Sequence, residues 1–120
     1  MEFGIYHECV SLTGRPDSEG FREAFGIVDA AEQYGLDVMW LAELHFDPSR
    51  SLLSSPMIVA AAIAGRTERM RIGTSVQVLP LSNPLRLAEE AATLDHVCQG
   101  RLIFGVGRSG VAKTYEAYNI

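Results

Sequence analysis

Short runs of apolar residues recur along this chain, separated by stretches with helical periodicity. Four such runs, at residues 3–6, 38–42, 72–79 and 102–106, lack the in-and-out alternation of a half-exposed strand, although the third carries polar interruptions. Runs of this length are typical of strands that are buried on both faces, as in a parallel sheet. The pattern therefore predicts four mostly buried strands.

Three helices are predicted between these strands. Apolar residues recur at helical spacing from Phe21, and Gly35 stands where a left-handed cap would end this first helix. The other two begin with a serine or asparagine followed by proline, a common helix start. They are expected over residues 57–64 and from Pro84 to Gly100, where glycine again ends the periodic pattern.

Strands and helices therefore alternate as βαβαβαβ, which is the pattern of an α/β protein with parallel strands and right-handed crossovers. Two architectures fit this order: an open doubly wound sheet, or part of a (β/α)8 barrel. A complete barrel needs about 250 residues. As a barrel, residues 1–120 would form one domain with only the first four βα units, a half barrel. Its first and fourth strands would have unpaired edges. The polar stretch after Arg108 would begin a further loop and helix.

Composition narrows the possible partners and the compartment. The net charge is −5, with no basic stripe to bind phosphates, which argues against nucleic acid and anionic membranes as partners. No apolar run approaches the length of a membrane span. The two cysteines, Cys9 and Cys98, lie far apart and form no CxxC motif, so reduced thiols in a cytoplasmic protein are expected.

Polar side chains that could bind a ligand or take part in a reaction lie at or just after the ends of the predicted strands. They are His7, Glu8, Glu43, His45, Ser75, Gln77, Arg108 and Ser109. Because ligands bind at the carboxyl ends of the strands in both architectures, these residues share one rim of the sheet. The sequence therefore predicts a ligand site at this rim.

His45 has two interpretations that the residues leave open. It could exchange a proton, bind a ligand or coordinate a metal, or it could be tied to Glu43 or to the backbone as a structural residue of the loop. A metal is the weaker hypothesis, because no second ligand has the spacing of a helical zinc motif. His96 lies inside the third helix, away from the strand ends, and is expected to be a surface or packing residue.

Two small-residue motifs are also open to two interpretations. Gly73, Thr74 and Ser75 could let the backbone approach a flat ligand, or could form a bulge that helps to close a barrel. The segment from Gly105 to Gly110 matches G-x-G-x-x-G, but too little chain follows it for a dinucleotide fingerprint. Arg108 in this segment could meet a phosphate or could form a surface ion pair.

Three motifs in order resemble the N-terminal part of the bacterial luciferase-like, flavin-dependent monooxygenases. They are MEFGIY, AAEQYGLDVMWLAELHF and MRIGTSVQVLPLSNPLRLAEEAATLDHVCQGRLIFGVGRSG, and the likeness covers nearly all of the chain. The resemblance implies a (β/α)8 barrel whose second half is absent. It also implies reduced FMN as cofactor, molecular oxygen as co-substrate, a small organic substrate and a homodimer in the full-length form. A separate flavin reductase could supply the cofactor.

The resemblance also implies roles for individual residues. His45, with Glu43 nearby, resembles the second histidine of the family's E-H-H-F sequence. Leu44 stands in place of the first, the base of light-emitting members, which argues against luciferase activity. Ser75 and Val76 match a pair that is often joined by a cis peptide bond beside the flavin.

The last motif carries two further positions of the family. Arg108 resembles the arginine that meets the flavin phosphate. Gly107 occupies the position of a reactive cysteine in some luciferases, so no thiol chemistry is expected there. Two alternatives stay open: hydride transfer with coenzyme F420 in a similar barrel, and an inactive fragment that needs the missing half.

Overall fold

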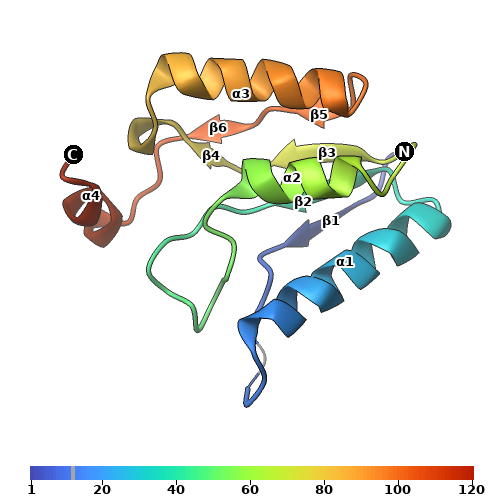
Figure 1. Ribbon diagram of the computed structural model, residues 1–120, viewed down its shortest axis with the longest axis horizontal. Coiled ribbons are helices and arrows are strands. Elements are labelled where there is room, and N and C mark those ends of the chain that lie inside the picture. Colours follow the sequence, from blue (N-terminus) through green and yellow to red (C-terminus); the bar gives the residue numbers. More distant parts are fainter. Residues whose placement is uncertain (12) are drawn as a thin grey trace.

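The computed structural model describes residues 1–11 and 13–120. Its main sheet has four parallel strands in the order β1-β2-β3-β5. These strands are β1 (Gly4–His7), β2 (Val38–Leu41), β3 (Arg71–Thr74) and β5 (Leu102–Ile103). The first and the last lie at the two edges, as the half-barrel prediction required. Figure 1 shows the strands running from right to left, so their carboxyl ends lie together on the left.

The third and fourth predicted strands are each broken in two, which corrects their expected extents. After β3 the chain makes a second short strand, β4 (Gln77–Val78), and then the 3-10 helix η1 (Leu79–Leu81). A strand β6 (Val106–Gly107) follows β5 and pairs with β4 in a separate parallel sheet. The break has a hydrogen-bonding cause: the Ser75 amide still donates to Leu41 of β2, whereas the Gln77 amide donates to Gly105, 2.8 Å away.

Two of the predicted helices have the expected starts, and the first begins earlier than predicted. The expected starts are those of α2 (Pro56–Ala64) and α3 (Pro84–Val97). Helix α1 (Asp17–Gln33) starts four residues before Phe21. The first turn of α1 contains acidic residues, which are favourable at the positive end of the helix dipole. They add nothing to the apolar pattern from which the start of the helix was predicted. The Asn83 side chain caps α3 by accepting from two backbone amides. A fourth helix, α4 (Ala112–Tyr118), occupies the expected polar segment.

The main sheet has one covered face and one open face. Side chains such as Met39, Leu41 and Ile72 point to the covered face and are fully buried in the core with residues of α1, α2 and α3. The open face carries Tyr6, which is 54% exposed, and the indole of Trp40. This indole lies across Gly73, where a Cβ atom would come within 2.3 Å of the ring. The open face corresponds to the interior of a barrel.

The amino ends of the strands are tied together by Arg101, which precedes β5. Its guanidinium donates to the carbonyl oxygens of Ala64, Thr67, Met70 and Cys98, and to the Thr67 hydroxyl, at distances of 2.8–3.1 Å. Each of these acceptors would otherwise need a partner in a partly buried region. Arg101 therefore joins the end of α2 and the end of α3 to the start of β3.

Glu32, at the end of α1, has a similar role at the same edge of the sheet. Its carboxylate accepts the amides of Glu68, Arg69 and Met70, at 2.8–2.9 Å, just before β3. Burial raises the pKa of this carboxyl, but the three amide donors and the charge of Arg69 together lower it by more, so the net effect is a lowered pKa. Within the described chain, no helix is long and apolar enough to cross a membrane.

Candidate functional site

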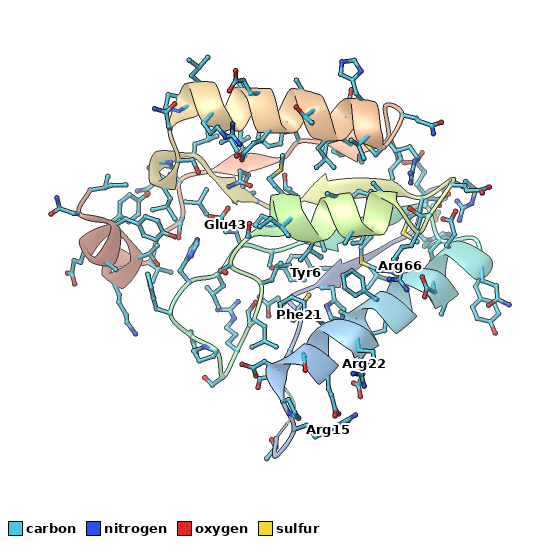
Figure 2. All side chains as sticks on the ribbon, in the orientation of Figure 1. Tyr6, Arg15, Phe21, Arg22, Glu43 and Arg66 are labelled. Atoms are coloured by element: carbon cyan, nitrogen blue, oxygen red, sulfur yellow. The ribbon has the colours of Figure 1, made fainter. Side chains whose placement is uncertain are left out.

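Glu43 and His45 form a buried pair just beyond β2. His45 Nε2 lies 2.8 Å from Glu43 Oε1, and the two side chains are 8% and 3% exposed, respectively. The other carboxylate oxygen accepts the Val78 amide at 2.8 Å, so Glu43 also joins the end of β2 to β4. Figure 2 shows Glu43 beside the first turn of α2. His45 is therefore tied to Glu43, as one of its two interpretations expected, and it still lies at the predicted rim.

The second ring nitrogen of His45 is also engaged, by a residue that the sequence did not single out. The Tyr118 hydroxyl of α4 lies 3.3 Å from His45 Nδ1, and the two rings meet edge to face with centroids 5.3 Å apart. Phe46 packs beside both rings. An ionised carboxylate only accepts hydrogen bonds, so beside an ionised Glu43 a neutral His45 would carry its proton on Nε2 and accept from Tyr118 at Nδ1. A residue 73 positions away leaves no local signal of this contact.

A hollow of about 520 Å³ lies against this pair. Its polar lining includes Glu43, His45, Ser55, Gln77, Ser82 and Tyr118. Gln77 is 5% exposed, and its buried Oε1 has no hydrogen-bond partner among the described residues. A buried amide oxygen without a partner is uncommon, because it loses water and gains nothing in return. Gln77 is therefore an unsatisfied polar side chain in the wall of the hollow.

Arg108 lies in a second hollow, of about 470 Å³, at the carboxyl end of β6. This hollow is also lined by Ser109, Gly110, Tyr115 and Glu116. Over residues 1–11 and 13–120, no carboxylate forms an ion pair with the Arg108 guanidinium, so the surface ion pair considered for it is not formed. The Tyr115 hydroxyl donates to the Arg108 carbonyl and fixes the backbone there. The guanidinium is thus available to an anion.

The remaining predicted residues lie where β4 and β6 approach each other. The Ser75–Val76 peptide bond is cis, as the family resemblance implied. A Cβ atom on Gly107 would lie 2.7 Å from Val76 Cγ2, and one on Gly105 would lie 2.1 Å from the Thr74 carbonyl oxygen. Only glycine permits this close approach of the two short strands. The small residues thus serve the break in the sheet, and a role toward a flat ligand stays a prediction.

The predicted site residues fall into three groups along one rim. Glu43, His45 and Gln77 share the first hollow, Arg108 lines the second, and Val76 meets Gly107 between the two short strands. Helix α4 carries residues of both hollows. Figure 1 shows it on the left, beyond the tips of the strands.

Other polar candidates have structural roles. His7 Nδ1 accepts the Cys9 amide at 2.8 Å, and burial lowers the pKa of this imidazole. Glu8 pairs with Arg50, and His96 is exposed on α3. Burial raises the pKa of the Cys9 thiol to about 11, which makes it a poor nucleophile. The described residues contain no group of three His, Cys, Asp or Glu side chains that could hold a metal.

Parallel strands with outer helices and a polar rim at the strand tips are the features of part of a (β/α)8 barrel. The family model described as luciferase-like monooxygenase matches residues 1–120, and the chain belongs to this family. It is 30% identical over 118 residues to an alkanal monooxygenase alpha chain from a Kryptophanaron alfredi symbiont, a match that covers 98% of this chain and 33% of that protein. The chain therefore spans about a third of this relative.

Solved structures agree on the fold. The monooxygenase RslO1 from Streptomyces bottropensis superposes with a TM-score of 0.92 at 30% identity, over 100% of this chain and 37% of that one. The FMN complex of the oxygenating constituent of 3,6-diketocamphane monooxygenase, from Pseudomonas putida, has a TM-score of 0.91 at 23% identity and covers 33% of that chain. The F420-dependent tetrahydromethanopterin reductase of Methanopyrus kandleri superposes with a TM-score of 0.74 at 23% identity, over 99% of this chain and 30% of that one. The last two show the fold alone.

Proposed function

We propose that this chain is the N-terminal part, about the first half of the barrel, of an oxidoreductase that uses reduced FMN and molecular oxygen to oxygenate a small organic substrate. Membership of the luciferase-like monooxygenase family supports the reaction class. Bound reduced FMN would supply the electrons that activate oxygen. The protein's own residues would bind the cofactor, orient the substrate, exclude water and move protons.

The unpaired guanidinium of Arg108 is the observation that carries the cofactor assignment. FMN ends in a phosphate, and a guanidinium binds phosphate with two parallel hydrogen bonds. Arg108 lines a hollow at the carboxyl ends of the strands, the end at which barrel enzymes bind phosphates. Glu116 lines the same hollow and would favour a pose that keeps the phosphate on the arginine side. The residues present therefore fit the phosphate group of FMN.

The other predicted residues have proposed roles at the same rim. Ser75, Val76 and Gly107 would lie against the flavin ring, because their backbones approach one another with little side-chain bulk between them. His45 would help to orient or polarise the substrate through its neighbouring side chains, and Glu43 would hold the imidazole in one tautomer. Leu44 provides no proton at the position where light-emitting relatives have a histidine, so we expect oxygenation without light.

Hydride transfer with coenzyme F420 is the alternative reaction. It is favoured by the F420-dependent reductase that shares the fold, and F420 also carries a phosphate. The third possibility is that residues 1–120 are inactive without the missing half of the barrel. Oxygen consumption separates the first two, and cofactor binding separates both from the third.

The protein would act in the cytoplasm, since Cys9 and Cys98 are both free thiols. A flavin reductase would supply reduced FMN. We also propose a homodimer of the full-length protein through the groove between α2 and α3, where Ile58 is 71% exposed on a helix that is apolar on all sides. Ile58→Asp should then convert a dimer to a monomer in size-exclusion chromatography with light scattering. A wild-type monomer would contradict the proposal.

The test of the reaction is a single-turnover experiment with isotopically labelled oxygen. The full-length protein, loaded anaerobically with reduced FMN, is mixed with labelled oxygen gas and a panel of alkanals and cyclic ketones. We expect mass spectrometry to find one labelled oxygen atom in an organic product. Unlabelled products, together with reduction of a substrate by reduced F420 under anaerobic conditions, would support the alternative reaction and contradict the monooxygenase.

A further inference from the structure

We propose that Tyr118 is a catalytic residue of this site and exchanges a proton between a ligand in the first hollow and His45. The inference rests on the proposed function, because the ligand is taken to be the substrate or the cofactor of that reaction. It begins from three side chains in a row: the Tyr118 hydroxyl, the His45 imidazole and the Glu43 carboxylate. Glu43 and His45 lie in the loop after β2, and Tyr118 lies on α4.

His45 itself has no free nitrogen with which to meet a ligand. Nε2 is bound to Glu43 at 2.8 Å, and Nδ1 faces the Tyr118 hydroxyl at 3.3 Å. The imidazole is also covered, with only 8% of its side chain exposed. Any proton that His45 exchanges with a ligand must therefore pass through one of its two neighbours. Glu43 is even more buried and is already held by the Val78 amide, which leaves Tyr118.

Tyr118 has the exposure that this role requires. It lines the hollow and is 42% exposed, and its ring is held edge to face against His45 and beside Phe46. A hydroxyl whose base is oriented by a third group is the arrangement by which enzymes activate a hydroxyl. The sequence Tyr118–His45–Glu43 has this arrangement, with the carboxylate at its buried end.

The proton step is balanced within the chain of three residues. A ligand O–H or acidic C–H gives its proton to the Tyr118 oxygen while the Tyr118 proton passes to His45 Nδ1. The imidazolium that forms is stabilised by the negative charge of Glu43, 2.8 Å from Nε2. The reverse sequence protonates a ligand oxygen anion and returns the imidazole to its neutral form. No oxidant or further reactant is needed for either direction.

The wall of this hollow contains an unsatisfied polar group, the Gln77 amide oxygen. This Oε1 atom is buried, has no partner in the described part of the chain, and belongs to a side chain that lines the same hollow as Tyr118. The charged groups that line the hollow are Glu43 and Glu90, and Lys113 lies beside Phe46, which also lines it. Glu90 is paired with Arg86, and the Lys113 ammonium donates to the Phe46 carbonyl. Because Glu90 and Lys113 are engaged in these contacts, Tyr118 is the group left to exchange a proton with the ligand.

The first arm of the test compares Tyr118→Phe with the wild type and with Tyr34→Phe, a control at an 81% exposed tyrosine after α1. Phenylalanine keeps the packed ring and deletes only the hydroxyl. Reduced FMN bound to the full-length protein is mixed with oxygen and substrate over a range of pH. We expect Tyr118→Phe to bind FMN as the wild type does and to lose about 100-fold in turnover. The control should be unchanged. Wild-type turnover and pH dependence in Tyr118→Phe would overturn the proposal.

The second arm uses Glu43→Gln to separate a proton path from simple packing. Residues that act as one unit give non-additive effects. The double variant of Tyr118→Phe and Glu43→Gln should therefore be no slower than the slower single variant. Multiplied losses would mean that the two residues act independently, which overturns the chain of three residues.

The third arm needs no turnover and keeps the proposal separate from the proposed function. Diethyl pyrocarbonate reacts with a free imidazole lone pair, and mass spectrometry reports its addition to His45. Without the Tyr118 hydroxyl the lone pair on Nδ1 is free, so Tyr118→Phe should react several-fold faster than the wild type and Tyr34→Phe. An equal rate of reaction at His45 in Tyr118→Phe and the wild type would overturn the contact between Tyr118 and His45. If the wild type fails to bind FMN, the proposed function is wrong, while this arm still decides whether Tyr118 controls His45.

Discussion

At the amino ends of the strands, the Arg101 guanidinium donates five hydrogen bonds and the Glu32 carboxylate accepts three backbone amides. At the carboxyl ends, the Gln77 amide oxygen is buried without a partner, and Arg108 has no ion pair in the described chain. Arginine is thus fully engaged at one end of the sheet and available at the other.

This difference teaches where stability and function are located in the fold. Polar groups that satisfy one another hold elements together, whereas polar groups without partners have unused binding capacity. Barrel enzymes place their chemistry at the carboxyl ends of the strands and their stabilising contacts at the amino ends. The two arginines offer a direct way to separate the two properties.

The largest expected effect is at the amino ends, in Arg101→Met. The substitution removes the guanidinium donor of four backbone carbonyls, and we expect a loss of about 3 kcal/mol or more in the free energy of unfolding. Urea denaturation followed by the fluorescence of Trp40, the single tryptophan, measures it. Arg108→Met is the matched control and should change stability by less than about 0.5 kcal/mol. Equal losses in the two variants would remove the distinction between the ends.

A smaller effect is expected at the carboxyl ends, where the link between β5 and β6 meets the end of β3, in Gly105→Ala. The new Cβ atom would lie 2.1 Å from the Thr74 carbonyl oxygen, so the two segments must separate. We expect a cost of about 2 kcal/mol in thermal or urea unfolding. In Gly26→Ala the new methyl group meets nothing within 4 Å, and a helical glycine is replaced. This control should gain up to about 1 kcal/mol. A neutral Gly105→Ala would show that the approach is looser than described.

The smallest expected effect is on the pH dependence of the free energy of unfolding, in Glu32→Gln. Its pKa is lowered in the folded protein from an ordinary value of 4.5, so its contribution to stability is present above that pH and is lost as the pH falls through the folded value. Glu32→Gln should therefore unfold more easily at neutral pH and show a weaker loss of stability below about pH 4.5. Glu89→Gln, at an exposed position of α3, is the control. An unchanged acid transition in Glu32→Gln would contradict the role.

The sequence predicted the elements of the fold better than their ends. Strand β2 and the starts of α2 and α3 follow from local patterns: an apolar run, and a polar residue before proline. The start of α1 was missed because its first turn is acidic and adds nothing to an apolar repeat. The break after β3 was missed because it depends on the hydrogen bond from Gln77 to Gly105, which belongs to a different predicted strand.

The candidate site was predictable in its position and not in its connections. The rim followed from the rule that parallel strands end together, and the structure places His45, Gln77 and Arg108 there. Their division between two hollows could not be predicted, because it depends on the position of α4, whose residues line both hollows. The contact between Tyr118 and His45 depends on the same helix, so no local pattern around either residue contains it.

An FMN titration of the full-length protein tests the central claim most directly. Flavin absorbs where tryptophan emits, so quenching of the tryptophan fluorescence reports binding. The wild type, Arg101→Met and Arg108→Met are compared under conditions where all three are folded. We predict that Arg101→Met binds FMN as the wild type does and that Arg108→Met binds roughly 10- to 100-fold more weakly, the loss of one charge-assisted phosphate contact. Wild-type affinity in Arg108→Met would contradict the account.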